Sequence, residues 1–411
     1  MKKIFIMLFC LTLLLPLYAQ NNNGGTPAKN KPSFARQSFE LGIDVGAGLD
    51  NDLIGINDIL TKDIVIDLTK IGSDMGDSGL NINAAAIAGL YFNIKNVKIK
   101  QSIWEYGFFL GVDGDVKLNL PKSLFSIITE GNMNNHLIEG TITASGGIYA
   151  EAGVGISARF NKLRIGVKPA LFSPLVFIPQ TNSGINYSLS TTDEEIALSS
   201  SGEISIYSPF IQDGELKFGE LKFGGDLSLD CEYALFSFLD IGGSISRIPI
   251  IPATVQNRLQ LVLGEIDFNV SGQAMISGEG IGEFPEFDFS EKYDTFEMSV
   301  FRPMRFDLYV RLKPFSNEVL VIKPNVGFSF DINNKKGFFN VGAEAQLNLI
   351  DMLIINLSTD YTESIWTHKL GLVFNLRLFE LNLQAALRSE SFTGSLKAQG
   401  ARVNVGLRFG W

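Results

Sequence analysis

Hydrophobic residues alternate with polar residues or glycine along the C-terminal part of the chain. At the C-terminus one side of a strand would carry Val403, Val405, Leu407, Phe409 and Trp411, and the other Arg402, Asn404, Gly406, Arg408 and Gly410. The stretches 338–349, 352–363, 367–378 and 380–390 repeat this pattern. A period of two indicates β-strands with one apolar and one polar face. Each strand must therefore place one face away from water.

Two sheet architectures meet that requirement. In a soluble sandwich the apolar faces pack together, and the sheets keep edges that need protection. In a transmembrane barrel the apolar faces contact lipid, and every backbone group pairs with a neighbouring strand. Tight turns at Asn161–Lys162, Ile350–Asp351 and Phe379–Glu380 alternate with long polar loops, as in outer-membrane barrels. We therefore predict an all-β, antiparallel, up-and-down transmembrane β-barrel.

The predicted barrel has about fourteen strands, within a range of about twelve to sixteen. The strand cores are 39–48, 81–94, 104–118, 139–160, 163–173, 225–237, 239–248, 292–313, 319–332, 338–349, 352–363, 367–378, 380–390 and 396–411. Two further stretches, 185–208 and 258–277, also have strand patterns. They would form either hairpins outside the barrel or two more barrel strands.

The N-terminus has the pattern of an export signal. Lys2 and Lys3 precede an apolar stretch from Ile4 to Leu15, and Ala19 is a suitable cleavage position. We expect a signal peptide at 1–19, a periplasmic segment at 20–38 and an outer-membrane barrel at 39–411. After the first twenty residues no apolar run approaches the ~18 to 20 residues of a membrane helix. The expected location is the bacterial outer membrane, with its lipid and the barrel-insertion machinery as partners.

Composition leaves little room for other functions. The formal net charge is −10 with no basic stripe, which argues against a nucleic-acid partner. The chain has 2 His, His136 and His368, with no nucleophile motif near either. After signal cleavage only Cys231 would remain, too few His and Cys for a zinc or iron site without carboxylates. We predict no catalytic residue, no metal, no cofactor and no enzymatic activity.

The polar faces of the strands predict a charged lumen. Inward-facing aromatic residues would add apolar patches to it, namely Phe109, Tyr149, Phe172, Phe236 and Tyr309. The charged residues would either pair across the wall or line a pore, and both readings remain open. The candidate lining residues are Asp113, Glu151, Arg164, Lys168, Asp230, Arg311, Glu344, Arg377, Arg388 and Arg402.

Two loops contain apolar residues at near-helical spacing. The first, 49–80, carries Ile56, Ile59, Leu60 and Ile64, and the second begins at Pro121 and carries Phe125, Ile127 and Ile128. Burying each such side chain is favourable by roughly 1.5 to 3 kcal/mol. We expect these short helices to fold against the barrel mouth or into the lumen, and to form an apolar vestibule that acts as a gate.

The last strand resembles the signal that outer-membrane barrels present to the insertion machinery, through Val405, Leu407, Phe409 and terminal Trp411. The strand count and the apolar helices resemble the long-chain fatty-acid transporter (FadL-like) family. That resemblance implies entry of hydrophobic compounds from outside and exit by a lateral or axial path. The family plugs its barrel with an N-terminal hatch longer than the segment from Gln20 to Ser38, so its binding residues are not transferred.

The sequence therefore predicts a channel or transporter for small hydrophobic or amphipathic molecules. The alternative is a surface-exposed interaction, adhesion or structural barrel, in which the long loops at 179–224 and 249–291 contact host or matrix partners.

Overall fold

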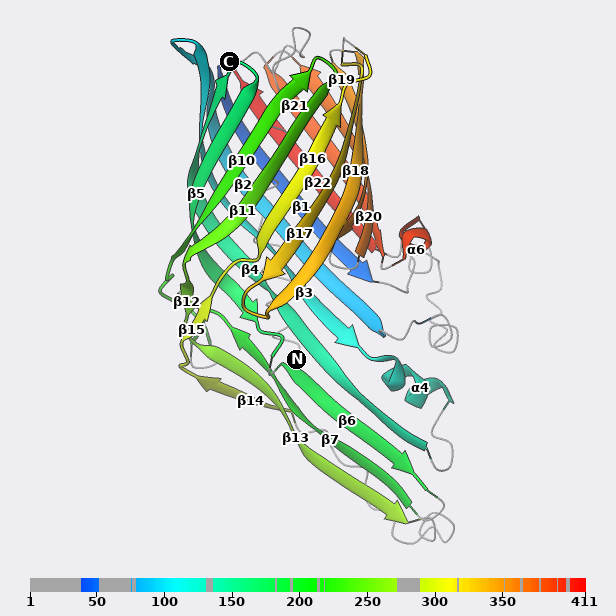
Figure 1. The fold of residues 1–411 in the computed structure, drawn as a ribbon. Coiled ribbons are helices and arrows are strands. Elements are labelled where there is room, and N and C mark those ends of the chain that lie inside the picture. The colour runs from blue at the N-terminus through cyan, green and yellow to red at the C-terminus, as the bar shows by residue number, and fades with distance from the viewer. Residues whose placement is uncertain are drawn as a thin grey trace.

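The chain forms a closed barrel from which part of the same sheet projects (Figure 1). No helix in the described ranges has the length and apolar character needed to cross a bilayer. The computed structural model describes residues 38–51, 75, 79–130, 136–181, 183–192, 195–212, 215–217, 219–271, 289–315, 318–350, 352–362, 365–376, 378–389, 391–396 and 400–411.

The barrel closes because its last strand pairs with its first. β22 runs antiparallel to β1 from Glu40↔Gly410 to Asp50↔Gly400. In order around the ring, the strands are β1 (Phe39–Asn51), β2 (Leu80–Ile99), β3 (Ser102–Leu120), β4 (His136–Phe160), β5 (Leu163–Ile178), β10 (Gly224–Phe236), β11 (Leu239–Ile251), β16 (Met304–Leu312), β17 (Leu320–Asp331), β18 (Lys336–Ile350), β19 (Leu353–Thr362), β20 (Ile365–Leu376), β21 (Phe379–Ser389) and β22 (Gly400–Gly410). All neighbours in this ring are antiparallel. The predicted all-β, antiparallel closed barrel is thus confirmed.

The two faces of the wall have opposite character. Large apolar side chains are exposed on its outside, as at Leu308, 46% exposed, and Leu370, 47% exposed. Charged and amide side chains are buried, as at Asp44, 2% exposed, and Asn375, 2% exposed. This arrangement is the reverse of a soluble protein, in which apolar residues are the buried ones.

The two ends of the barrel differ in their connections. Short turns join β2 to β3, β4 to β5 and β10 to β11 at the end where the chain reaches its C-terminus (Figure 1). Asn161 has a φ of 54° in the β4–β5 turn, a left-handed conformation that asparagine tolerates. We call the end with these short turns the turn end. The opposite end, which carries the long connections, is the loop end.

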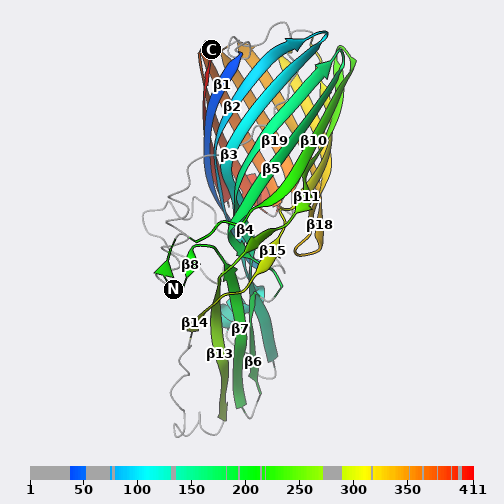
Figure 2. The same ribbon diagram turned by 90° about the vertical axis from the view of Figure 1, so that its left-hand side faces the viewer.

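Beyond the loop end, the sheet continues as an extension, which comprises β6 (Gly184–Thr191), β7 (Glu195–Tyr207), β13 (Arg258–Ser271) and β14 (Phe289–Asp294). β4 has 25 residues, and its first part, His136–Thr143, pairs with β6, whereas its pairing with β5 begins at Gly146. Figure 2 shows the extension leading away from the barrel. The described residues of the predicted stretches 185–208 and 258–277 therefore pair outside the ring. The predicted count of about fourteen strands concerned the barrel; the main sheet, which includes the extension, has 18.

The single strand predicted at 292–313 is wrong. The chain instead forms β14, then β15 (Met298–Val300), and then β16 after a break at residues 301–303. Pro303 lies in this break and has no backbone N–H to donate to a ladder. β15 pairs with β12 (Ala253–Val255) in a small separate sheet, and β8 (Ile211–Gln212) pairs with β9 (Glu215–Leu216) in another.

Two short helices belong to loop-end connections. α4 (Lys122–Glu130) begins directly after Pro121, as expected from the sequence. It packs on the extension, because the Ser123 hydroxyl donates to the Glu139 carbonyl at 2.8 Å and lies 2.7 Å from the Tyr187 hydroxyl. α6 (Phe392–Leu396) connects β21 to β22, and the Phe392 ring contacts the His368 ring with centroids 4.7 Å apart.

An exposed ion pair holds the outer strand of the extension. Nε of Arg258 on β13 donates to Asp294 on β14 at 2.9 Å. This hydrogen bond lowers the pKa of Asp294 below its ordinary value of 3.8. Because the folded pKa is the lower one, the pair stabilises the protein above pH 3.8, and this contribution is lost as the pH falls through the folded pKa.

We predict that Asp294→Asn weakens the β13–β14 pairing at neutral pH by roughly 0.2 to 1 kcal/mol, since exposed ion pairs contribute little. Hydrogen exchange of the β14 amides should increase to match. In the wild-type protein the same increase should appear only below pH 3.8. Equal β14 protection in the two proteins at pH 7 would contradict the assigned role of the pair.

Candidate functional site

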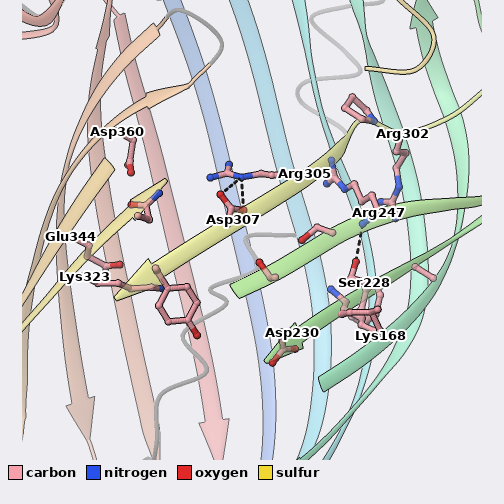
Figure 3. A pocket seen from close by; sticks show the side chains of 18 of the residues that line it. Lys168, Ser228, Asp230, Arg247, Arg302, Arg305, Asp307, Lys323, Glu344 and Asp360 are labelled. Atoms are coloured by element: carbon pink, nitrogen blue, oxygen red, sulfur yellow. Dashed lines mark hydrogen bonds and ion pairs between the residues drawn. The ribbon is translucent and has the colours of Figure 1, made fainter. Parts of the chain in front are cut away.

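The barrel encloses a cavity of about 530 Å³, into which side chains from β3 to β21 project (Figure 3). Its lining is mainly charged and amide, with few apolar groups. The lining residues are Phe109, Glu151, Arg164, Lys168, Ala170, Asp226, Ser228, Leu229, Asp230, Ser244, Ser246, Arg247, Arg302, Pro303, Arg305, Asp307, Tyr309, Lys323, Asn325, Glu344, Asn356, Ser358, Asp360, Lys369, Asn382 and Gln384. No group of three or more His, Cys, Asp and Glu suited to a metal occurs in the described part of the chain.

Two aromatic rings lie flat against the wall of the cavity. A Cβ atom on Gly153 would lie 2.3 Å from Cζ of Phe109, and one on Gly242 would lie 2.3 Å from Cζ of Tyr309. Each ring therefore occupies the space that a side chain on the neighbouring strand would need. The Tyr309 hydroxyl donates to Glu232 at 2.9 Å, which fixes the orientation of that ring. The two rings therefore lie along the wall of the cavity rather than across it.

A lysine lies over each of these rings. Nζ of Lys168 is 3.8 Å from the centroid of the Phe109 ring, and Nζ of Lys323 is 4.3 Å from that of Tyr309. Both distances are within the range of a cation–π contact.

Arg302 marks the loop end of the cavity. It belongs to residues 301–303, between β15 and β16, which we call the Arg302 segment. The guanidinium pairs with Glu151 of β4, and with Asp226 of β10 at 2.7 Å, with all three side chains at most 8% exposed. It also lies 5.0 Å above the ring of Phe172. Two barrel strands therefore hold the segment by buried ion pairs.

Arg247 spans the lumen beside this cluster. The register of β10 and β11 shifts between Leu227 and Leu229, and Arg247 has a φ of 60° at this bulge. Its backbone N–H donates to the Ser228 hydroxyl at 3.0 Å. Its guanidinium pairs with Asp113, which lies on β3. A bulge redirects side chains in this way, and here it directs an arginine across the lumen.

The small β12–β15 sheet lies next to the Arg302 segment. Ala253 and Val300 are fully buried in a cluster with Tyr149, Phe172, Phe177 and Tyr207. From the β17–β18 connection, the Asn333 side chain accepts the Phe301 N–H at 2.9 Å and donates to the Phe301 carbonyl at 2.6 Å. Ion pairs, apolar packing and the Asn333 side chain therefore hold the Arg302 segment and the β12–β15 sheet at the loop end. We call this arrangement the closure of the loop end.

Toward the turn end, further ion pairs occupy the lumen. Lys313 pairs with the fully buried Asp240 at 2.6 Å, and Arg408 pairs with Glu380 at 2.9 Å. Glu40, 3% exposed, pairs with Lys95. The cavity therefore lies between two ionic layers.

The predicted lining residues divide into two groups. Glu151, Arg164, Lys168, Asp230 and Glu344 line the cavity. The others lie elsewhere or are not described: Asp113 pairs with Arg247, Arg311 lies 3.9 Å from Asp240, Arg388 pairs with Asp50, Arg402 lies against Gly48, and Arg377 is outside the described residues.

The alternation pattern did not predict that Arg247 and Arg302 lie at the loop end of the cavity. Arg302 fell inside the wrongly continuous strand at 292–313, and Pro303 was the signal for a break there. Arg247 lies at a bulge, where simple alternation fails. A second bulge, between Ala234 and Phe236, overturns the inward placement of Phe236, which is 53% exposed and stacks on Phe238.

The predicted vestibule stays a prediction. Ile56, Ile59, Leu60 and Ile64 lie outside the described residues. Phe125 packs with Met75 and Leu80 and is not among the described residues that line the cavity. Ile127 and Ile128 belong to the same helix, α4.

The side chains of the expected insertion signal lie on the outer face of β22. Val405, Phe409 and Trp411 are exposed there, and Leu407 is half-buried. The Trp411 ring stacks on that of Phe39, with centroids 5.9 Å apart.

Comparison with known proteins gives a likeness of fold. Residues 32–231 match a family described as a family of unknown function (DUF5723), and no curated protein matches the chain. The Pseudomonas putida toluene transporter TodX is 11% identical, over 96% of this chain and 94% of that one, with a TM-score of 0.48. The Ralstonia pickettii toluene transporter TbuX is 8% identical over 97% and 100%, with a TM-score of 0.48. A Pseudomonas aeruginosa FadL homologue is 7% identical over 93% of each chain, with a TM-score of 0.45. A homologue of FadL is thus among the structures to which the chain is similar, as the sequence resemblance predicts.

We predict that Arg302→Ala loosens the closure of the loop end. It would leave Glu151 and Asp226 buried without their cation, at a cost of about 3 to 5 kcal/mol. Asn333→Ala should have a smaller effect, about 1 kcal/mol for each hydrogen bond lost. Hydrogen exchange of β12 and β15 should rise in the order wild type, Asn333→Ala, Arg302→Ala.

Arg305→Ala is the matched control. Arg305 lines the same cavity but pairs with Asp307 on its own strand, at 2.7 Å. It therefore does not bind the Arg302 segment to another strand. Equal exchange of β12 and β15 in the Arg302 and Arg305 variants would contradict the role assigned to Arg302.

Proposed function

We propose that the protein is a bacterial outer-membrane channel for small polar and amphipathic molecules, which pass through the lumen cavity. The observation that carries this proposal is the combination of an apolar outer surface with a charged cavity inside a closed ring. Neither feature alone would suffice, because a plugged structural barrel shares the first and many soluble proteins share the second.

The outer surface supports the membrane part of the proposal. Exposed leucine, valine and phenylalanine side chains, such as Leu308 and Leu370, would contact lipid. Aromatic pairs gather near the turn end, including Phe39 with Trp411, Phe236 with Phe238 and Phe379 with Phe409. Aromatic residues prefer the interface between lipid and water. In this proposal the turn end is periplasmic and the loop end extracellular.

The lining of the cavity supports the proposed class of transported molecule. Its apolar lining is limited to Phe109, Ala170, Leu229, Pro303 and the ring of Tyr309, among many charged and amide groups. A wholly apolar solute would find few contacts there, whereas a molecule with a polar end could use both kinds of lining. We therefore favour the amphipathic form of the sequence prediction over the hydrophobic one.

Three further sequence predictions fit within this proposal. Residues 1–19 would direct export, and β22 would present its outer face to the barrel-insertion machinery. The apolar helix predicted around Ile59 and Leu60 would lie at the extracellular mouth.

The second candidate is a surface interaction protein anchored by its barrel. The extension is the observation that favours it, since β6, β7, β13 and β14 project beyond the ring. Removal of the extension from a protein that still folds would separate the two. Lost surface binding with unchanged solute uptake would favour this candidate, and the opposite result would favour the channel.

Planar-bilayer recording and proteoliposome swelling test the channel proposal. Purified full-length protein should give a small conductance and admit solutes below the size of the 530 Å³ cavity. A large, steady conductance would instead indicate a general porin. No conductance and no swelling with glucose would contradict a channel.

Substitution on the two faces of the wall tests the membrane orientation. Leu308→Lys places a charge on the outer face and should destabilise the barrel by about 2 to 4 kcal/mol near the bilayer midplane. Asn325→Lys, on the neighbouring strand but lining the cavity, should be tolerated. The amount of heat-resistant barrel in outer membranes measures both. Equal yields would show that the outer face does not contact lipid.

A further inference from the structure

The charged groups of the cavity balance one another. Among the described residues, the cations of the lining number seven: Arg164, Lys168, Arg247, Arg302, Arg305, Lys323 and Lys369. Within the same part of the chain, its carboxylates number six, and Asp113, which pairs with Arg247, is a seventh; the six are Glu151, Asp226, Asp230, Asp307, Glu344 and Asp360.

We propose that this balanced lumen favours small zwitterions, molecules with one ammonium and one carboxylate group, which bind between Lys168 and Asp230. The inference rests on the proposed channel function and deepens it by naming a solute class. Balanced charge alone would make the lumen indifferent to the sign of an ion. The arrangement of the charges around Lys168 and Asp230 is what favours a solute that carries both.

Charges of both signs occur together around the cavity wall. Arg164 of β5 pairs with Asp230 of β10 at 2.9 Å, and Lys369 of β20 pairs with Asp360 of β19 at 2.8 Å. Further pairs are Arg247 with Asp113, Arg305 with Asp307, and Lys323 with Glu344, which lies opposite it in the pairing of β17 and β18. An ion of either sign therefore meets attraction and repulsion at each of these places.

The neighbouring carboxylates offset the charge of Lys168. Its Nζ lies 3.8 Å from the centroid of the Phe109 ring, which carries no net charge. Arg302 pairs with both Glu151 and Asp226, so these three groups, which we call the Arg302 cluster, have one negative charge in excess. The β5–β10 register places Asp226 diagonally across from Lys168. An anion drawn to Lys168 is thus also repelled by the cluster, whereas a zwitterion carries no net charge to be repelled.

Asp230 supplies a carboxylate beside Lys168. The register of β5 and β10 places Ser228 opposite Lys168 and Asp230 opposite Gly166, so Asp230 is a diagonal neighbour of Lys168, about 7 to 8 Å away. A Cβ atom on Gly166 would clash with Oδ1 of Asp230, so this glycine lets the carboxylate lie against β5. The Asp230 side chain is 40% exposed. Figure 3 shows Lys168, Ser228 and Asp230 on neighbouring strands of the cavity wall.

A zwitterion uses both charges at this position. Its carboxylate accepts hydrogen bonds from the Lys168 ammonium and from the Ser228 hydroxyl, whose oxygen accepts the Arg247 N–H. Its ammonium donates to Asp230, which binds Arg164 through Oδ2 at 2.9 Å. A carboxylate has about four acceptor positions, so Asp230 can accept both donors. An ion of one sign makes only half of these contacts, and an uncharged solute makes neither charged contact.

Four small solutes with the same carbon skeleton separate the contributions of the two charges. Serine carries both charges, glycerate only the carboxylate, serinol only the ammonium, and glycerol neither. In proteoliposome swelling with full-length protein, serine should enter about 2- to 10-fold faster than each of the others, the range expected for two partly exposed ion pairs. Such weak binding helps a solute to enter a narrow lumen and still lets it leave.

Lys168→Met and Asp230→Asn should each abolish the preference for serine, but in opposite ways. Lys168→Met leaves the Arg302 cluster unbalanced, so serinol should become the fastest solute. Asp230→Asn leaves Arg164 without its partner, so glycerate should become the fastest. A merely structural role of either residue would not reverse the preferred sign. Heat-resistant migration of each variant verifies that the barrel is intact.

Reversal potentials in a KCl gradient give a second readout of the same balance. The chloride-to-potassium permeability ratio should be about 1 in the wild-type protein, because lining charges set selectivity in narrow pores. Lys168→Met should lower this ratio and Asp230→Asn should raise it. The opposite order of the two variants would contradict the balance assigned to these residues.

Two double variants that keep the net charge provide the matched control. Lys168→Met/Asp230→Asn removes both binding groups and should admit serine no faster than glycerol. Glu215→Gln/Lys217→Met removes an exposed ion pair of 2.8 Å, and neither of its residues is among the described residues that line the cavity. This second variant should keep the wild-type preference for serine.

The outcomes separate the two proposals. Equal entry of serine and glycerol through a conducting wild-type protein would overturn the zwitterion assignment alone. An equal serine preference in the two double variants would also overturn it. No conductance and no entry of glycerol would instead overturn the channel function.

Discussion

Closure of the ring by β1 and β22 is the constraint on which the rest of the structure depends. It pairs Glu40 through Asp50 with the last strand, so the barrel wall has no free edge. Once the ring is closed, the side chains of every strand must divide between an outer and an inner surface. The apolar set lies outside and the charged set inside. A lumen full of charges follows from closure, and those charges must then find partners in a confined space.

The partners come from different strands, and this links the loops to the wall. Arg302 lies in a break between two strands, yet its ion pairs are with β4 and β10. Asn333 binds the same segment from the β17–β18 connection. The loop end of the cavity is therefore closed by groups that are far apart in sequence. The same pairing holds Glu151 and Asp226 in buried contact with one guanidinium.

Regular alternation made much of this fold predictable, and its interruptions set the limit. The alternation near Val405 and Leu407 predicted the closed barrel. The same alternation in other strands placed Glu151, Lys168 and Asp230 in the cavity lining. It could not reveal Arg247, which faces the lumen through a bulge, or Arg302, which lies in a strand break. It also could not show that β6, β7 and β13 pair outside the ring, because a barrel strand and an extension strand have the same period.

In the proposed channel, the outside of the wall contacts lipid while water reaches the lumen. Spin labels in bilayers measure this most directly, on Leu308→Cys outside and Ser244→Cys in the cavity, each in a Cys231→Ala background. The label at position 308 should collide with oxygen, which concentrates in lipid, and the label at 244 should collide with a water-soluble nickel chelate. The reverse pattern, or equal access of the chelate to both labels, would contradict it.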